Sequence, residues 1–435
     1  MSKKTLTLSV LTASIALATG QVQSAAFQLA EQSTSGLGRA YAGEGAAADN
    51  AAVLGRNPAA MTLFDRPALS AGAVYVNPEI DVEGKPTQQQ AAGASQAGLP
   101  TQSSDIADDA LVPFFYYVQP INGQWAAGIG AFTNYGLSTS YQDNHYAGPV
   151  AGKTALTTLN LNPSLAYRVN DHLSLGAGFN AVYADAELIR HKGIASLQPL
   201  PAGFGGNATD ELVRLAGDDW GYGWNIGLLL EADSDNRWAL SYRSEIDLTL
   251  EGQYSSALPN GVPWGPNNPA GTGGNAIPGK LDLTLPAIAE LSGFHQVNSQ
   301  WALHYGLMWT EWSSFEELRA LGSDGNTLFQ KDEKFRNSWR VSAGVTHFMN
   351  DQWTLRGGLA YDQSPVPAAT RSISIPDVDR TWYTLGAGYA LNARLSLDAA
   401  LAFLKGGQVE VNEMPYRFTS GGDAWLMGLQ LNYRF

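Results

Sequence analysis

Histidine, cysteine and serine are the residues that most often carry out catalysis or bind metals, and their pattern here offers no such site. The chain contains no cysteine, and its six histidines, at positions 145, 172, 191, 295, 304 and 347, lack metal-ligand spacing. No G-x-S-x-G nucleophile motif occurs. A lipase or protease would need a serine or aspartate that only the fold brings to a histidine, and hydrolysis of a lipid ester or a peptide would reveal it. We therefore expect no enzyme, no metal site and no cofactor.

The composition is typical of a protein whose outer surface is apolar. Charged residues make up 15% of the 435 residues, and aromatic residues make up 10%; a charged fraction of roughly 25% is usual. The formal net charge is −14, which disfavours nucleic-acid binding because phosphates require clustered lysine and arginine. Beyond the N-terminus there is no run of about 20 apolar residues, which excludes membrane helices. A transmembrane β-barrel is the leading class.

Strictly alternating segments supply the strands of such a barrel. Residues 301–310 place large apolar side chains at every second position, and residues 395–403 do the same. A side-chain period of two indicates strands with one apolar face, which looks outward in a lipid barrel. Short turns containing Asn or Asp, whose backbone tolerates the left-handed conformation of tight hairpins, come before a Trp or Leu. They lie at Asn122-Gly123, Asn170-Asp171, Asp235-Asn236, Asn298-Ser299, Asn350-Asp351 and Asn392-Ala393.

These turns allow the strands to be counted. Six periplasmic hairpins join twelve strands, and the first and last strands raise the total to fourteen, an even number as in bacterial barrels. The predicted fold class is therefore all-β: a transmembrane antiparallel β-barrel of 14 strands. The strands are expected near residues 68–77, 111–119, 124–133, 156–169, 172–184, 221–232, 237–251, 280–296, 300–312, 335–349, 352–363, 380–390, 394–405 and 424–435.

The longer segments between the hairpins are expected to be extracellular loops. The loop 252–279 is rich in Gly, Pro and Asn, whereas the loop 185–220 is apolar. Apolar residues on an exposed loop usually pack into a local cluster, but they can also line a hydrophobic entry site for a ligand. The apolar residues of this loop are Leu188, Ile189, Ile194, Leu197, Leu200, Phe204, Leu212 and Leu215.

The N-terminal region divides into two parts before the first strand. Residues 1–24 carry Lys3 and Lys4, then an apolar core and small residues, which predicts a cleaved signal peptide rather than a buried helix. Residues 25–66 do not alternate and are rich in Gly and Ala. Because fourteen strands leave a lumen too wide for side chains to fill, we expect this segment to be a plug, or hatch, inside the barrel rather than a disordered tail. Residues 67–435 then form the barrel.

Several motifs along the chain carry a resemblance to a known family. They are Phe27-Gln28-Leu29, the run 35–46, Arg56-Asn57-Pro58-Ala59, Asn134-Tyr135-Gly136-Leu137, the runs 178–184 and 327–331, Ser364-Pro365-Val366-Pro367 and the run 371–377. Together they resemble the FadL family, the long-chain fatty acid transporters of the Gram-negative outer membrane. The resemblance covers the mature chain from end to end. It implies a fourteen-stranded barrel with an N-terminal hatch, in agreement with the turn count.

The resemblance also implies a route for the substrate. A long-chain fatty acid would first bind an apolar groove among the loops 185–220 and 252–279. It would then enter a pocket inside the barrel, where the family's basic positions fall on Arg190 and Lys331. Burying an acyl chain contributes about 0.8 kcal/mol per CH₂, and a desolvated carboxylate needs a charged partner. Without the resemblance, each residue would be interpreted as an exposed loop charge.

The same resemblance assigns gating residues. Phe27 matches a hatch position that reaches the pocket, and Asn57-Pro58-Ala59 matches the hatch motif that faces an inward kink in the third strand. Gly136 lies in that kink, and Gly within a strand commonly marks a bulge or bend. A kink would open the wall sideways and release an apolar ligand laterally. Considered locally, Asn57-Pro58 could simply start a helix.

Partners and alternatives complete the predictions. Long-chain fatty acids, outer-membrane lipid and lipopolysaccharide are the expected partners of a monomer, with no nucleic acid. The main alternative is a channel of the same family for aromatic or other hydrophobic compounds, but Arg190 and Lys331 favour an acid over a neutral ligand. A non-specific porin is disfavoured by the hatch, and an outer-membrane lipid hydrolase is the least favoured alternative.

Overall fold

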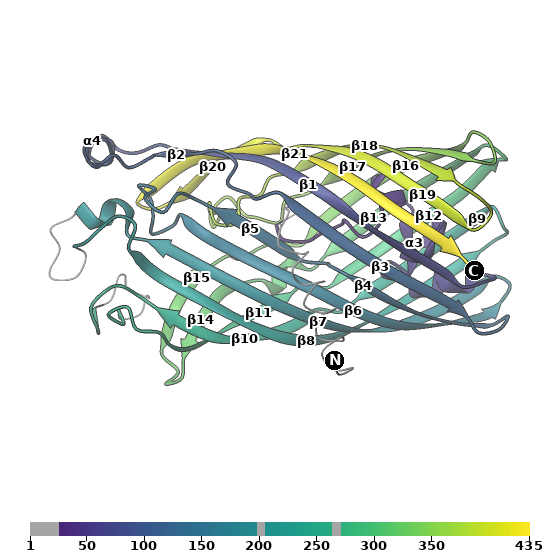
Figure 1. The fold of residues 1–435 in the computed structure, drawn as a ribbon, viewed down its shortest axis with the longest axis horizontal. Helices are drawn as coiled ribbons and strands as arrows, with labels where there is room; N and C mark the ends of the chain where they lie inside the picture. The colour runs from purple at the N-terminus through teal and green to yellow at the C-terminus, as the bar shows by residue number, and fades with distance from the viewer. Residues whose placement is uncertain (1–25, 198–204, 263–270) are drawn as a thin grey trace, which may run out of the picture.

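The computed structural model describes residues 26–197, 205–262 and 271–435, which form one closed antiparallel β-barrel around an N-terminal segment (Figure 1). The predicted signal peptide, residues 1–24, lies outside the described residues. In the described part of the chain, no helix is long and apolar enough to cross a membrane.

The wall has the fourteen strands that the turn count predicted, counted over the described residues. Five of the fourteen are interrupted and carry two labels each. Strand β1 pairs with β21 along its whole length, from Ala68 opposite Arg434 to Gly84 opposite Phe418, and this pairing closes the barrel. In chain order the strands are β1 (Ala68–Gly84), β3 (Ala110–Pro120), β4 (Trp125–Phe132) with β5 (Gly136–Ser140), β6 (Gly152–Asn170), β7 (Leu173–His191), β8 (Glu211–Glu231), β9 (Asn236–Arg243) with β10 (Ile246–Ser255), β11 (Ile277–Leu285) with β12 (Ile288–Asn298), β13 (Trp301–Thr310) with β14 (Glu317–Gly322), β15 (Thr327–Asp332) with β16 (Ser338–Phe348), β17 (Trp353–Asp362), β18 (Arg380–Ala390), β19 (Leu395–Lys405) and β21 (Tyr416–Arg434).

Several strands continue well beyond their predicted ends, on the side of the barrel that carries the longer connections. We call this side the extracellular end. Both ends of the predicted loop 185–220 are strand, because β7 runs to His191 and β8 begins at Glu211. Short additional elements lie at this end: β2 (Gln102–Ser103), β20 (Gln408–Glu413), α4 (Gln88–Ala97), η3 (Gly193–Leu197) and η4 (Trp312–Ser314).

Alternation places an apolar face on the outside. On β13, the side chains of Leu303 and Tyr305 are exposed, whereas those of the alternate residues Ala302 and His304 point inward and are buried. This is the pattern expected of a wall that faces lipid on one side and a polar interior on the other.

The Asn residues of the short turns act through their side chains rather than through a left-handed backbone. The Oδ1 atom of Asn122 accepts hydrogen bonds from the N–H groups of Gln124 and Trp125, both at 2.9 Å. The same pattern recurs at Asn298, Asn350 and Asn392. None of these four residues is among the described residues with a positive φ. Side-chain caps of this kind explain why Asn is preferred here.

The N-terminal segment, residues 26–66, lies inside the barrel. It folds into the short helices α2 (Thr34–Leu37), α3 (Glu44–Ala47), η1 (Ala51–Gly55) and η2 (Pro58–Leu63). It contacts strands around the wall: Thr34 N donates to Gln430 Oε1 of β21 at 2.7 Å, and Thr62 Oγ1 donates to Ser174 Oγ of β7 at 2.8 Å. Nearly all of its residues up to Met61 are buried. Figure 1 shows the segment in purple within the wall.

Candidate functional site

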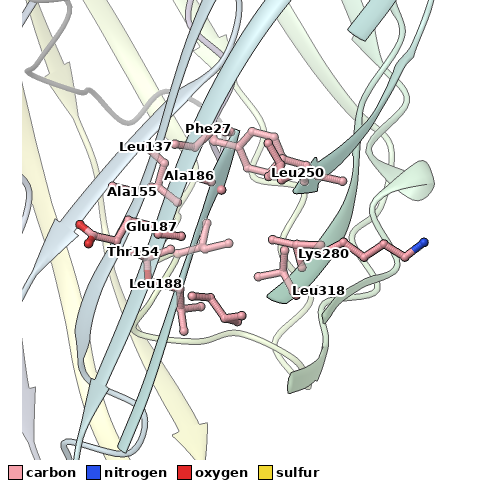
Figure 2. A pocket seen from close by; sticks show the side chains of 18 of the residues that line it. Phe27, Leu137, Thr154, Ala155, Ala186, Glu187, Leu188, Leu250, Lys280 and Leu318 are labelled. Atoms are coloured by element: carbon pink, nitrogen blue, oxygen red, sulfur yellow. The ribbon is translucent and has the colours of Figure 1, made fainter. Parts of the chain in front are cut away.

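An apolar cavity lies toward the extracellular end of the barrel. Figure 2 shows residues of β6 and β7 on one side and of β10, β11 and β14 on the other. The cavity and its opening together hold about 650 Å³ of space that protein atoms do not occupy. Most of the residues that line it are apolar, among them Phe27, Leu137, Leu156, Leu188, Leu215, Leu250, Leu281, Leu283, Phe315, Leu318 and Ile375.

Two charged residues at the cavity keep their charges outside it. Glu187 and Lys280 line the cavity only through their aliphatic stems, and Figure 2 shows their charged ends pointing away from it. Leu188 and Leu215, predicted as loop residues, lie on β7 and β8 with buried side chains. Part of the apolar set found in the sequence therefore lines the lumen. Leu200 and Phe204 from that set lie outside the described residues.

Arg190 is at the edge of this cavity. It lies near the end of β7, not in a loop, and its side chain is buried. Its Nη2 donates to Thr154 Oγ1 at 3.0 Å and to Ser374 Oγ at 2.8 Å. Its Nη1 donates to the carbonyl oxygens of Lys153 and Ile189. Arg190 does not itself line the cavity, but Thr154 does, so the guanidinium is one hydrogen bond away from a residue of the cavity wall.

Lys331 meets Arg190 at the same hydroxyl. It lies on β15, and its Nζ donates to Ser374 Oγ at 3.4 Å. The structure therefore brings together two basic residues that are far apart in the sequence. The Lys331 Nζ atom also lies 3.1 Å from Glu413 Oε1 and 3.7 Å from Glu333 Oε1.

Sequence reasoning missed Ser374, Glu333 and Glu413 as members of this site. Ser374 belongs to the run 371–377, and Glu333 follows Lys331 by two residues, but neither position carries a chemical signal of its own. Glu413 comes from the far end of the chain, at the close of β20. Only the barrel geometry could place these residues together.

Phe27 connects the cavity to the N-terminal segment. Its ring lines the cavity and packs edge-on against Trp312 and Phe315, with ring centroids 4.6 Å and 5.2 Å away. The Phe27 carbonyl oxygen accepts a hydrogen bond from Gly136 N at 2.8 Å. Two residues later, Leu29 N donates to Asn134 O at 2.7 Å. Residues 27–29 therefore bond to the backbone of the third wall strand.

The third wall strand is interrupted at this point. β4 ends at Phe132 and β5 begins at Gly136. β3 pairs with β4 only as far as Phe115 opposite Ala131, and β5 pairs with β6 but, within the described pairings, not with β3. The wall thus has a gap beside Gly136, at the position where the sequence indicated a kink.

Asn57-Pro58-Ala59 is bonded within the hatch and to β8, and its position facing the kink stays a prediction. Asn57 Nδ2 donates to Gly45 O at 3.0 Å and to Leu228 O of β8 at 3.2 Å. Its Oδ1 accepts from Ala59 N at 3.0 Å and so caps η2, as the local interpretation expected. Phe27 to Leu29, rather than this motif, bonds to the strand interruption. The motif fits against β8 because Gly227 has no side chain to obstruct it.

The fold and the site define a class: a plugged transmembrane β-barrel that encloses an apolar cavity with a basic pair at its edge. Residues 15–435 match the family described as "Outer membrane protein transport protein (OMPP1/FadL/TodX)". The chain belongs to this family, and it is a protein of the Gram-negative outer membrane and not an enzyme.

Individual relatives agree with the family assignment. The chain is 45% identical to the long-chain fatty acid transport protein of Escherichia coli (strain K12), and the match covers 100% of both chains. Its fold is similar to the crystal structure of a Pseudomonas aeruginosa FadL homologue, with a TM-score of 0.82, 26% identity, and coverage of 94% of this chain and 100% of that one. The Pseudomonas putida toluene transporter TodX, at 18% identity and a TM-score of 0.67 over 95% and 100% of the chains, shares the fold.

Proposed function

We propose that this protein carries long-chain fatty acids passively across the outer membrane. The observation that supports this most directly is the pair Arg190 and Lys331 at the edge of an apolar cavity. An amphipathic acid needs both features, since its chain gains from burial and its desolvated carboxylate needs a charged hydrogen-bond donor. A relative that is 45% identical is named a long-chain fatty acid transport protein.

In the proposed route, the acid is captured among the segments 185–220 and 252–279 and then enters the cavity. Further passage along the barrel axis is unfavourable for an acyl chain, because the space next to the hatch is polar. That smaller space is lined by residues such as Gln28, Arg56, Asn134, Arg243 and Glu290. The gap beside Gly136 offers a lateral exit that avoids it.

Phe27 is proposed as the gate between cavity and exit, since its ring lines the first and its backbone bonds to the second. Displacement of Phe27 would enlarge the cavity and free Gly136 N in one movement. Asn57-Pro58-Ala59 takes the role of anchoring the rest of the hatch to β7 and β8. Outer-membrane lipid and lipopolysaccharide as surroundings, and a monomeric state, remain predictions.

The test compares a long-chain acid with its methyl ester. Replacing both Arg190 and Lys331 with Ala should weaken binding of the acid by about 1–3 kcal/mol, typical of hydrogen bonds to charged groups, and leave the ester nearly unchanged. Lys405→Ala, at an exposed ion pair with Asp423, is the matched control. Equal losses for acid and ester would remove the carboxylate role. They would then favour a channel for neutral hydrophobic compounds.

A further inference from the structure

The basic pair at Ser374 is opposed by two carboxylates. Glu413 Oε1 lies 3.1 Å from Lys331 Nζ, and Glu333 Oε1 lies 3.7 Å from it. Arg190 completes a group of two cations and two acids, whose charges cancel when all four are ionised. A substrate carboxylate that binds here therefore meets a site that is already neutral.

The two acids are held differently. Glu413 Oε2 accepts a hydrogen bond from Ile373 N at 2.9 Å, and its Oε1 forms the closer of the two ion pairs with Lys331. Glu333 is 1% exposed, and neither of its carboxylate oxygens has a hydrogen-bond partner among the described residues. A buried carboxylate without hydrogen bonds is the member of the group that accepts a proton most readily.

The surroundings of Glu333 act in the same direction. Glu333 lies in the interruption between β15 and β16, on the extracellular side of β16. Burial raises its pKa to about 7; Lys331 and Arg190 oppose this shift, and Glu413 adds to it. Tyr141, which interacts with Glu413 and Arg190, is the other titratable group at the site and donates its hydroxyl to Ile373 O at 2.7 Å.

We propose that Glu333 and Glu413 are internal counterions of the empty site, and that Glu333 takes up one proton from solvent when an anionic head group binds. The proposal rests on the proposed function and extends it. A third carboxylate beside the buried Arg190 and the partly buried Lys331 leaves an excess negative charge, which is costly in a largely desolvated site. Protonating Glu333 restores neutrality, and the proton returns to solvent when the ligand leaves. The site would thereby select an anionic head group and still release it.

The sign of the pH dependence follows from linkage. Below a pH of about 7, the pKa of Glu333 keeps it largely protonated in the empty protein. Ligand binding there takes up few protons, and the affinity hardly changes with pH. Above that value, binding takes up as much as one proton, and Kd should rise by up to about tenfold per pH unit. Replacing Glu333 with Gln mimics the protonated form, so this variant should bind more tightly than the wild type at high pH.

The experiment uses the purified full chain in detergent with hexadecanesulfonate, whose head group stays ionised between about pH 6 and about pH 9, far above the pKa of a strong acid. Hexadecanol is the uncharged probe. Kd is measured across this range for the wild type, Glu333→Gln, and Glu410→Gln, a control at an exposed acid of β20. Calorimetry of the wild type in two buffers of different ionisation enthalpy, at high pH, counts the protons taken up.

We expect the wild type and Glu410→Gln to lose affinity for the sulfonate as pH rises, with close to one proton taken up, and Glu333→Gln to show neither effect. Hexadecanol should show no pH dependence with any protein. A level Kd and no proton uptake by the wild type would overturn the inference, and so would an unchanged slope in a folded Glu333→Gln. If wild type binds the alcohol as tightly as the sulfonate at every pH, the proposed head-group site itself fails.

Discussion

The proposed gate can be tested by removing a single ring. Phe27→Ala deletes the side chain that packs among Trp312, Phe315 and Tyr135, but it keeps the backbone that bonds to Gly136. If the ring holds residues 27–29 against the interruption in the third strand, its loss should let this backbone detach. The rest of the hatch should stay in place, because it is bonded elsewhere around the wall.

The expected size follows from the packing. Phe27 is 2% exposed, and truncating a buried Phe to Ala costs about 3–5 kcal/mol. The ring contacts themselves contribute about 0.5–1.5 kcal/mol each. Even the lower limit of about 3 kcal/mol corresponds to a rise of roughly a hundredfold in local opening. Any change in binding should be similar for an acid and its ester, since Phe27 contributes apolar surface and no charge.

Hydrogen exchange measures the opening directly. The Gly136 and Leu29 amides, which bond across the interruption, should exchange faster in Phe27→Ala, whereas amides of intact strands such as β17 and β18 should not. Phe335→Ala is the matched control, because Phe335 packs against Trp312 and Phe315 in the same aromatic group. Unchanged protection of Gly136 in Phe27→Ala, or equal loss in both variants, would refute the gate.

Three further predictions concern the hatch and the exit. Gly136→Val should fill the gap and reduce uptake of labelled oleate by cells, while oleate binding to the purified protein persists; normal uptake would argue against the lateral route. Asn57→Ala removes three hydrogen bonds of a buried side chain and should destabilise the hatch by about 1–3 kcal/mol, seen as faster amide exchange over 57–63. Gly227→Val should displace η2, because any Cβ at this position overlaps Asn57. Protease cleavage within the hatch should therefore increase relative to Gly123→Val, a control at a position where a Cβ meets no neighbour.

The fold could be predicted because a membrane barrel imposes a strong pattern on its sequence. Lipid requires an outward apolar residue at every second position, and segments such as 301–310 show this alternation without interruption. The same side-chain cap recurs in four of the short turns, so the strand pairs could be counted. The capping residues are Asn122, Asn298, Asn350 and Asn392. The reason first given for Asn was wrong, however, since its side chain caps the turn and its φ stays negative.

Alternation is a weaker guide to the strands above the membrane. There both faces of a strand meet water or protein, so alternation no longer has to be strict. The pattern therefore predicts a loop over residues 185–220, although β7 continues to His191 and β8 begins at Glu211. The hydrogen bonds of Asn57 could not be predicted for a related reason. A motif match indicates that a residue corresponds to one in a related protein, but it does not say which strand that residue contacts. Asn57 contacts β8 because Gly227 has no side chain to obstruct it. Glu333 and Glu413 could not be assigned to the site, because no sequence pattern shows that an acidic residue lies close to a lysine in the folded protein.

Residues 27–29 touch both the cavity and the gap, and this makes the two thermodynamically linked if the gate operates as proposed. A ligand that displaces the Phe27 ring also moves the carbonyl that accepts from Gly136 N, so it binds better to the open form. Coupling of this kind is reciprocal. Any change that strengthens the bond between residues 27–29 and the third strand must therefore weaken ligand binding, and any change that loosens it without altering the cavity must strengthen binding. Gating and affinity at this site cannot be tuned independently, which distinguishes a gate built into the binding pocket from a plug that merely blocks a channel.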